Sequence, residues 1–288
     1  MVSMDELREK VQTESVSDVI ISDGSQELFR KITQPRKNLV HSIAKSVLAL
    51  GFGFALQEGI VSLDESIADA FAEETEKSLR SFETQYGKEA KEKQLRMLSK
   101  LRLRHLLSNT SGFRENFLTG FQRPYLKEDD WVSLCLCIPA DHEPGTVFLY
   151  SDANYYLIAK LLQRRTGKPL SEWLLKPMFE PVGIRYPTWE LDPQGDAVGC
   201  GGLLFTPDEL HRIGLLCLNR GRAGSLQVIP ESWLWTAAEE KISFGDGCGY
   251  GYGFWTAPDC YYMFGLGGIY NFISKNGDLL ITVSGLNL

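Results

Sequence analysis

A serine and a lysine three residues apart, Ser42 and Lys45, are the clearest sign of chemistry in this chain. They open an apolar run, residues 46–57 (SVLALGFGFALQ), that is typical of a buried helix. Residues three apart on a helix share a face. A serine hydroxyl is a weak nucleophile until a base takes its proton, and a lysine can be that base when burial disfavours its charged form. The beginning of a helix also offers free backbone N–H groups that could stabilise an oxyanion.

The same pair of residues has an ordinary interpretation. Serine is a common N-cap, and a lysine in the first turn of a helix is common on protein surfaces. The spacing of Ser42 and Lys45 therefore does not establish catalysis by itself, and the rest of the chain has to supply the other elements of a site.

The composition favours a compact globular protein and argues against several classes of partner. The 288 residues are 43% hydrophobic and 23% charged, with a formal net charge of −7, which suits a large buried core. Basic residues are scattered, so we expect no binding to nucleic acid. No run approaches about 18 apolar residues, so we expect no membrane span. The polar N-terminus lacks the apolar core of a signal peptide, which predicts a cytoplasmic location.

Cysteine and histidine spacings do not indicate a metal site. The six cysteines lie mostly among apolar residues, as reduced thiols do, and Cys135 and Cys137 have no further ligand at zinc spacing. The four histidines are widely separated. We therefore expect no metal and no cofactor.

Strand-like runs lie at both ends of the chain, and helix-like runs lie between them. This order predicts an α+β fold, in which one antiparallel sheet built from both chain ends is flanked by helices and carries an inserted, mostly helical lobe. We expect a sheet lobe from residues 1–50 and 185–288, a helical lobe from residues 51–184, and an active site at their interface within a single structural unit. The expected strands are 19–21, 27–32, 250–256, 261–264, 270–274 and 279–284, and the expected helices are 4–12, 46–57, 62–71, 73–107, 153–166, 170–179, 207–219 and 230–240.

Three segments in this order resemble motifs of the serine β-lactamase and penicillin-binding-protein superfamily, on the class C side that includes family VIII esterases. The first is the S-x-x-K match at Ser42 and Lys45. The second, residues 144–155 (PGTVFLYSDANY), resembles the family's PG…F.YS(N/D)..Y segment ahead of a helix. The third, residues 265–268 (GLGG), resembles the family's K-T-G or H-x-G motif at an inner strand. The resemblance runs from about residue 19 to about residue 285 and implies a β-lactamase-like fold.

The resemblance implies a role for each matching residue. Ser42 would be the nucleophile, Lys45 would hold or shuttle its proton, and Tyr150 would act with the lysine as base and then as acid to the leaving group. Which of Lys45 and Tyr150 is the general base stays open, because a tyrosine with a pKa near 10 is a poor base at neutral pH. The oxyanion would be bound by the N–H groups of Ser42 and Ile269, or of Gly268 if the register lies one residue earlier.

Two departures from the family pattern bear on the substrate. Leu266 stands where many relatives carry a lysine or histidine that helps to hold a carboxylate, which favours neutral esters or amides. Asp152 replaces the asparagine of a strict Y-x-N motif, and its charge would repel an anionic substrate, attract an amine or pair with Lys45. Gly267 and Gly268 would let a substrate lie close to the strand edge.

The resemblance as a whole implies a serine hydrolase that cleaves a small ester, an amide or a short peptide through an acyl-Ser42 intermediate, without a cofactor. Two alternatives stay open: a β-lactamase or D-alanyl peptidase, and a non-catalytic binding protein that has kept the fold. The sequence does not indicate an oligomeric state.

Overall fold

The computed structural model describes residue 9 and residues 16–285, which divide into two compact units. The sheet unit consists of Met1–Gly53, Leu174–Thr188 and Leu203–Leu288, and the helical unit of Phe54–Trp173 and Trp189–Gly202.

These boundaries differ from the predicted ones at residues 51–53, 174–184 and 189–202 because of contacts distant in sequence. Leu174 packs against Gly51, and Glu190 pairs with Arg123. The helix predicted over residues 4–12 lies outside the described residues, except for Glu9.

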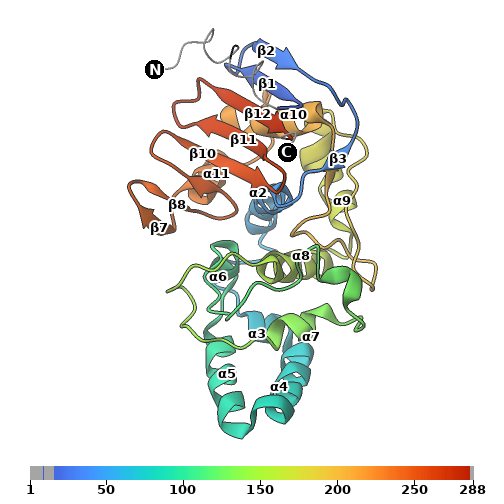
Figure 1. Cartoon of the computed structure of the whole chain (residues 1–288), viewed down its shortest axis with the longest axis vertical. Helices are drawn as coiled ribbons and strands as arrows, with labels where there is room; N and C mark the ends of the chain where they lie inside the picture. Colours follow the sequence, from blue (N-terminus) through green and yellow to red (C-terminus); the bar gives the residue numbers. More distant parts are fainter. Residues whose placement is uncertain (1–8, 10–15, 286–288) are drawn as a thin grey trace. The chain divides into compact units, whose positions relative to one another are not determined.

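The sheet unit holds an antiparallel sheet whose strands come from both ends of the chain, as predicted (Figure 1). Among the described residues the strand order is β2-β1-β12-β11-β10-β9-β8-β7, and Val19 pairs with Val283 where the two chain ends meet. The strands are β1 (Val19–Ser22), β2 (Glu27–Lys31), β7 (Ile242–Gly245), β8 (Cys248–Tyr250), β9 (Trp255–Thr256), β10 (Cys260–Gly265), β11 (Ile269–Ser274) and β12 (Leu280–Ser284). Two short pairs lie outside this sheet: β3 (Asn38–Leu39) with β4 (Leu204–Phe205), and β5 (Arg222–Ala223) with β6 (Leu226–Gln227).

The single strand predicted over residues 250–256 is wrong, because the chain turns there between β8 and β9. Gly253 has a φ of +85° and lies against α2 (Ile43–Gln57), where a Cβ atom would come within 2.7 Å of the Ala49 Cβ and 3.1 Å of the Lys45 carbonyl oxygen. The break therefore depends on a tertiary contact that local sequence patterns do not contain.

Three helices lie on the same face of the sheet: α2, α10 (Pro207–Leu218) and α11 (Glu231–Ala238) (Figure 1). The α10 helix begins with a capping box, in which Thr206 and Glu209 bond to each other's backbone N–H groups. In α2, a Cβ at Gly53 would clash with the Trp233 ring, whose Nε1 donates to the Ala49 carbonyl at 2.8 Å. Glycine inside a helix costs about 1 kcal/mol relative to alanine, and here it permits this close packing.

Aromatic rings cover part of the opposite face of the sheet. Along β10, Tyr261 is buried and donates to the Cys217 carbonyl of α10 at 3.1 Å, so the alternate residue Tyr262 points away from the helices. The Tyr262 ring stacks on Trp255, with 6.4 Å between ring centroids, and Tyr270 stacks on Phe272 at 4.8 Å.

The helical unit is built around α8 (Asp152–Thr166), which is buried along most of its length and ends at Gly167 in a left-handed conformation. Its other helices are α3 (Ile67–Ala70), α4 (Ala72–Tyr86), α5 (Lys88–Lys100), α6 (Leu103–Leu107), η1 (Arg123–Tyr125), α7 (Trp131–Leu136) and α9 (Leu170–Trp173). A π-helical turn η2 (Leu175–Phe179) and a 3-10 turn η3 (Glu180–Val182) follow in the sheet unit. In the described part of the chain, no helix is both long enough and apolar enough to cross a bilayer.

A buried ion pair fixes α8 in the helical unit. The side chain of Lys160 is 2% exposed and that of Asp192 is fully buried, and Lys160 Nζ donates to Asp192 Oδ2 at 3.0 Å. Lys160 also bonds to Asp196, and the Tyr156 hydroxyl donates to Asp192 at 2.8 Å. The buried carboxylate of Asp192 therefore has the buried Lys160 amine as its partner inside the unit.

We expect Lys160→Met to lower the free energy of unfolding by about 3–5 kcal/mol, because it leaves the Asp192 charge buried without its partner. Urea denaturation followed by circular dichroism measures this loss. A matched control is Lys168→Met, which removes the exposed pair with Glu172 and should change stability by less than about 1 kcal/mol. Equal effects of the two substitutions would contradict the prediction.

Candidate functional site

Ser42 and Lys45 lie together at the beginning of α2 in the sheet unit. Ser42 directly precedes the helix, and Lys45 Nζ donates a hydrogen bond to Ser42 Oγ at 3.1 Å. Lys45 is 1% exposed, whereas Ser42 is half-buried, so the serine is reachable and the lysine is enclosed. The predicted one-turn spacing thus brings a hydroxyl and an amine into direct contact.

The turn that leads into α2 leaves a backbone donor beside the Ser42 side chain. The Ile43 and Ala44 N–H groups bond to the carbonyls of Val40 and His41, but no acceptor in the described part of the chain takes the Ser42 N–H. His41 has a φ of +49°, which is uncommon for a residue other than glycine and shapes this tight turn. Burial lowers the pKa of the His41 imidazole, so it adds no positive charge beside Ser42 at neutral pH.

The glycine-rich third motif forms the turn between β10 and β11, also in the sheet unit. Gly265 and Ile269 pair across this turn, and Gly267 and Gly268 have φ values of +84° and +73°, which favour glycine. Leu266 is 55% exposed at its tip. A Cβ at Gly265 would clash with the carbonyl oxygen of Val40, two residues before Ser42. The missing side chain therefore lets the end of β10 lie against the turn that carries the serine.

The second motif lies in the helical unit, where α8 begins. Tyr150 is half-buried in the loop just before the helix. Asn109 ties this loop down, because its carbonyl accepts from the Leu149 N–H at 2.8 Å and its Oδ1 accepts from the Ser151 N–H at 3.2 Å. Asn154 of α8 donates to the same Oδ1 at 3.0 Å.

Asp152 is the first residue of α8 and lies near a buried guanidinium. Arg123 Nη1 is 3.9 Å from Asp152 Oδ2, and Arg123 also makes two hydrogen bonds of 2.8 and 2.7 Å to the Glu190 carboxylate. The Arg123 side chain is 8% exposed, and its charge faces two carboxylates. The carboxylate of Asp152 thus lies near a positive charge within the helical unit, that of the Arg123 guanidinium.

The structure brings the predicted site residues together in two groups. Ser42, Lys45 and the turn of residues 265–269 meet in the sheet unit, and Tyr150 and Asp152 are neighbours in the helical unit. Sequence reasoning missed Arg123 and Glu190, which are 67 residues apart and show no local pattern. Sequence reasoning also assigned no role to Asn109. The available signal was the segment of residues 103–112, which contains Asn109 and resembles the family's hLL..tSG stretch.

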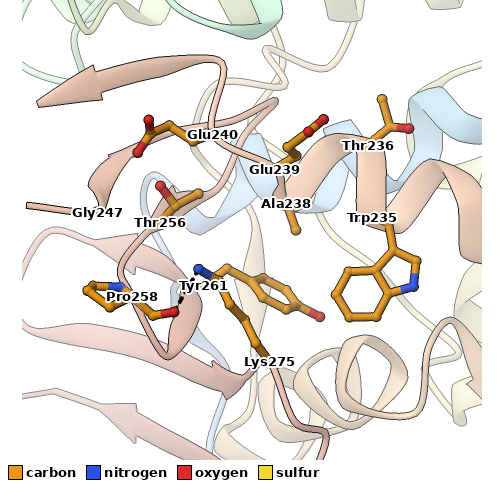
Figure 2. Close-up of a pocket in the computed structure, with 10 residues that line it drawn as sticks. All are labelled: Trp235, Thr236, Ala238, Glu239, Glu240, Gly247, Thr256, Pro258, Tyr261 and Lys275. Carbon is orange, nitrogen blue, oxygen red and sulfur yellow. Dashed lines mark hydrogen bonds between the residues drawn. The ribbon is translucent and has the colours of Figure 1, made fainter. Parts of the chain in front are cut away.

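A pocket of about 730 Å³ lies elsewhere in the sheet unit, near the end of α11 (Figure 2). Trp235, Glu239, Tyr261 and Lys275 line it, and Lys275 Nζ donates to the Pro258 carbonyl at 3.0 Å. It contains none of the motif residues, which stay the predicted site. Within the described residues, no group of three or more histidine, cysteine, aspartate or glutamate side chains could hold a metal ion.

Known proteins with similar sequences include transferases and amidases. Over 103 residues the chain is 34% identical to the ML-236A carboxylate methylbutanoyltransferase of Penicillium citrinum, covering 33% of this chain and 24% of that protein. Over 171 residues it is 28% identical to an N-acetylmuramyl-L-alanine amidase of Bacillus subtilis (strain 168), covering 57% of this chain and 36% of that protein. The chain thus spans well under half the length of these curated relatives.

Solved structures show the same fold over nearly the whole chain. The penicillin-binding protein from Bacillus halodurans superposes with a TM-score of 0.72 at 15% identity, covering 97% of this chain and 95% of that chain. The predicted β-lactamase-like fold is therefore confirmed. Residues 39–284 match the family described as Beta-lactamase, and this span includes all three motifs. The chain belongs to the β-lactamase family.

Proposed function

We propose that this protein is a serine hydrolase that cleaves an ester or amide through a covalent acyl-Ser42 intermediate. The observation that carries the proposal is the 3.1 Å hydrogen bond between Lys45 Nζ and Ser42 Oγ, in which a buried amine contacts a half-buried hydroxyl. A nucleophile within hydrogen-bond reach of a base is the arrangement that acyl transfer requires. A small-molecule ester, an amide or a short peptide is the proposed substrate.

In the proposed reaction, Ser42 Oγ forms a bond to the acyl carbon as the bond from that carbon to the leaving group breaks. The hydroxyl proton passes to Lys45 or Tyr150 and then to the departing alcohol or amine. The Ser42 N–H, which has no acceptor among the described residues, and the N–H of Ile269 or Gly268 would hold the developing oxyanion. Water, activated by the same base, then releases the acyl group and restores Ser42.

The roles of Tyr150 and Asp152 are proposed from the second motif. Their support in the helical unit is local: Asn109 holds the loop that carries Tyr150, and Arg123 lies 3.9 Å from the Asp152 carboxylate. A fixed tyrosine before α8 suits proton transfer, because a general acid must keep its hydroxyl in a constant place.

Water and an alcohol are both possible acceptors for the acyl group. The names of the two relatives described above differ in the kind of reaction: one is called a methylbutanoyltransferase and the other an amidase. Product analysis with a short ester in the presence and absence of a small alcohol distinguishes hydrolysis from transfer. The cytoplasmic location predicted from the sequence stays a prediction.

We expect Ser42→Ala to lower kcat for short p-nitrophenyl esters at least about a thousand-fold, because the nucleophile is lost. The wild type should gain one rapid fluorophosphonate adduct that intact mass detects and peptide mapping places on Ser42. Ser81→Ala, which removes an exposed hydroxyl of α4, is the matched control and should keep full activity. Undiminished ester hydrolysis by a folded Ser42→Ala protein would refute the proposal.

Leu266 gives a second prediction, on substrate charge. Leu266→Lys should raise kcat/KM for a carboxylate-bearing ester about tenfold relative to a neutral ester of the same size, because it restores a cation at this position of the motif. The measurement is the ratio of the two kcat/KM values. Leu226→Lys, at a leucine that is 54% exposed in β6, is the control and should leave the ratio unchanged. A wild-type protein that already prefers the anionic ester, or turns over nitrocefin efficiently, would favour the β-lactamase alternative.

A further inference from the structure

A second serine, Ser22, contacts a histidine on the helix-covered face of the sheet. Ser22 is the last residue of β1, and its Oγ lies 2.8 Å from Nε2 of His211 in α10. The pairing of β1 with β2 shifts register between Ile21 and Ser22, and such bulges re-aim side chains. Both residues are buried, at 4% and 5% exposure.

The hydrogen bonds beyond His211 determine which nitrogen of the imidazole carries the proton. Asn271 Nδ2 donates to the Leu210 carbonyl at 2.9 Å, and a carbonyl can only accept, so Asn271 Oδ1 faces the other way. Thr282 Oγ1 donates its single proton to that oxygen at 2.6 Å. Thr282 must therefore accept the 2.7 Å bond from His211 Nδ1–H.

This leaves Nε2 of a neutral His211 without a proton and facing Ser22, so the Ser22 hydroxyl donates to it. Burial lowers the pKa of His211 to about 4, which keeps the imidazole neutral at pH 7. The charged groups around it oppose one another: Glu27 and Asp208 favour the protonated form, whereas Arg30 disfavours it. A hydroxyl that donates to a neutral imidazole, which is itself oriented through its other nitrogen, has the polarity of an activated nucleophile.

Ser22 and His211 also line a cavity of about 320 Å³. Arg30 and Asp208, whose side chains are 40% and 44% exposed, line it as well, so it reaches the surface. Arg212 lines it too, and among the described residues its buried Nε has no hydrogen-bond partner. The volume is at the lower end of the range for small-molecule sites.

We infer that Ser22 is a second nucleophilic serine, with His211 as its base, and that it accepts an acyl or phosphoryl group from a small activated ester. In this step Ser22 Oγ bonds to the electrophilic carbon or phosphorus, the bond to the leaving group breaks, and His211 Nε2 takes the hydroxyl proton and passes it to the leaving group. The inference stands apart from the proposed function, because Ser42 takes no part in it.

The test is fluorophosphonate labelling of the wild-type protein, followed over hours by intact mass and peptide mapping. We expect a rapid adduct on Ser42 and a second, slower adduct on Ser22. The second should form about a hundred-fold more slowly, because an imidazole whose pKa is lowered to about 4 is a weak base at neutral pH. If no adduct forms on Ser22 at saturating probe in the folded wild type, the inference is overturned and the Ser22–His211 bond only ties β1 to α10.

Two variants separate this inference from the proposed function. Ser42→Ala should lose the rapid adduct and keep the slow adduct on Ser22. If the wild type is labelled on Ser22 but not on Ser42, the proposed function fails and this inference is supported. His211→Gln should reduce Ser22 labelling at least about tenfold. Unchanged Ser22 labelling in that variant would overturn the role of His211. Ser25, whose hydroxyl donates to Asp23 at 2.7 Å, is an internal control that should stay unlabelled.

Discussion

The close approach of two glycines to the beginning of α2 is the constraint on which the arrangement around Ser42 depends. Gly253 lies against Ala49 and the Lys45 carbonyl, and Gly265 lies against the Val40 carbonyl. Ser46 Oγ adds a 2.5 Å hydrogen bond to the Gly253 carbonyl. A Cβ at either glycine would push the helix away from the sheet and so move the serine away from the glycine turn of the third motif. The position of Ser42 and Lys45 thus follows from the close packing of backbone atoms around the beginning of α2.

Buried charge has a comparable role in the helical unit. Lys160 and Asp192 fix the middle of α8, and Arg123 with Glu190 lies beside Asp152 at its beginning. The buried members of these pairs, Lys160, Asp192 and Arg123, would be costly to bury alone, so each requires its partner in a defined place. Together they hold α8 in its middle and near its beginning, next to the loop that carries Tyr150.

Much of the fold could be predicted from the sequence because its signals are local. The alternation of half-buried strands after residue 260 and the apolar run after Ser42 each follow from a short stretch of residues. The S-x-x-K spacing likewise predicts that Ser42 and Lys45 share a helical face, and the two side chains are in contact. The functional roles of the motif residues stay predictions.

Several features that depend on distant residues could not be predicted. The turn between β8 and β9 follows from the contact of Gly253 with α2, and the Arg123–Glu190 pair joins positions 67 residues apart. The assignment of residues 174–184 to the sheet unit and of residues 189–202 to the helical unit has the same origin, since their packing partners lie far away in the chain. Local patterns carry no information on such pairs, because they arise only when the chain is folded.

The strand order also has a consequence for the protein during its own synthesis. Because β12 lies between β1 and β11, the hairpin of β1 and β2 cannot join the sheet until β12 has left the ribosome. Ser42 is made before the glycine turn beside it, which follows residue 264 in the sequence. A nascent chain therefore exposes the serine without its neighbours, and the arrangement around Ser42 is completed only after the turn of residues 265–268 has been made.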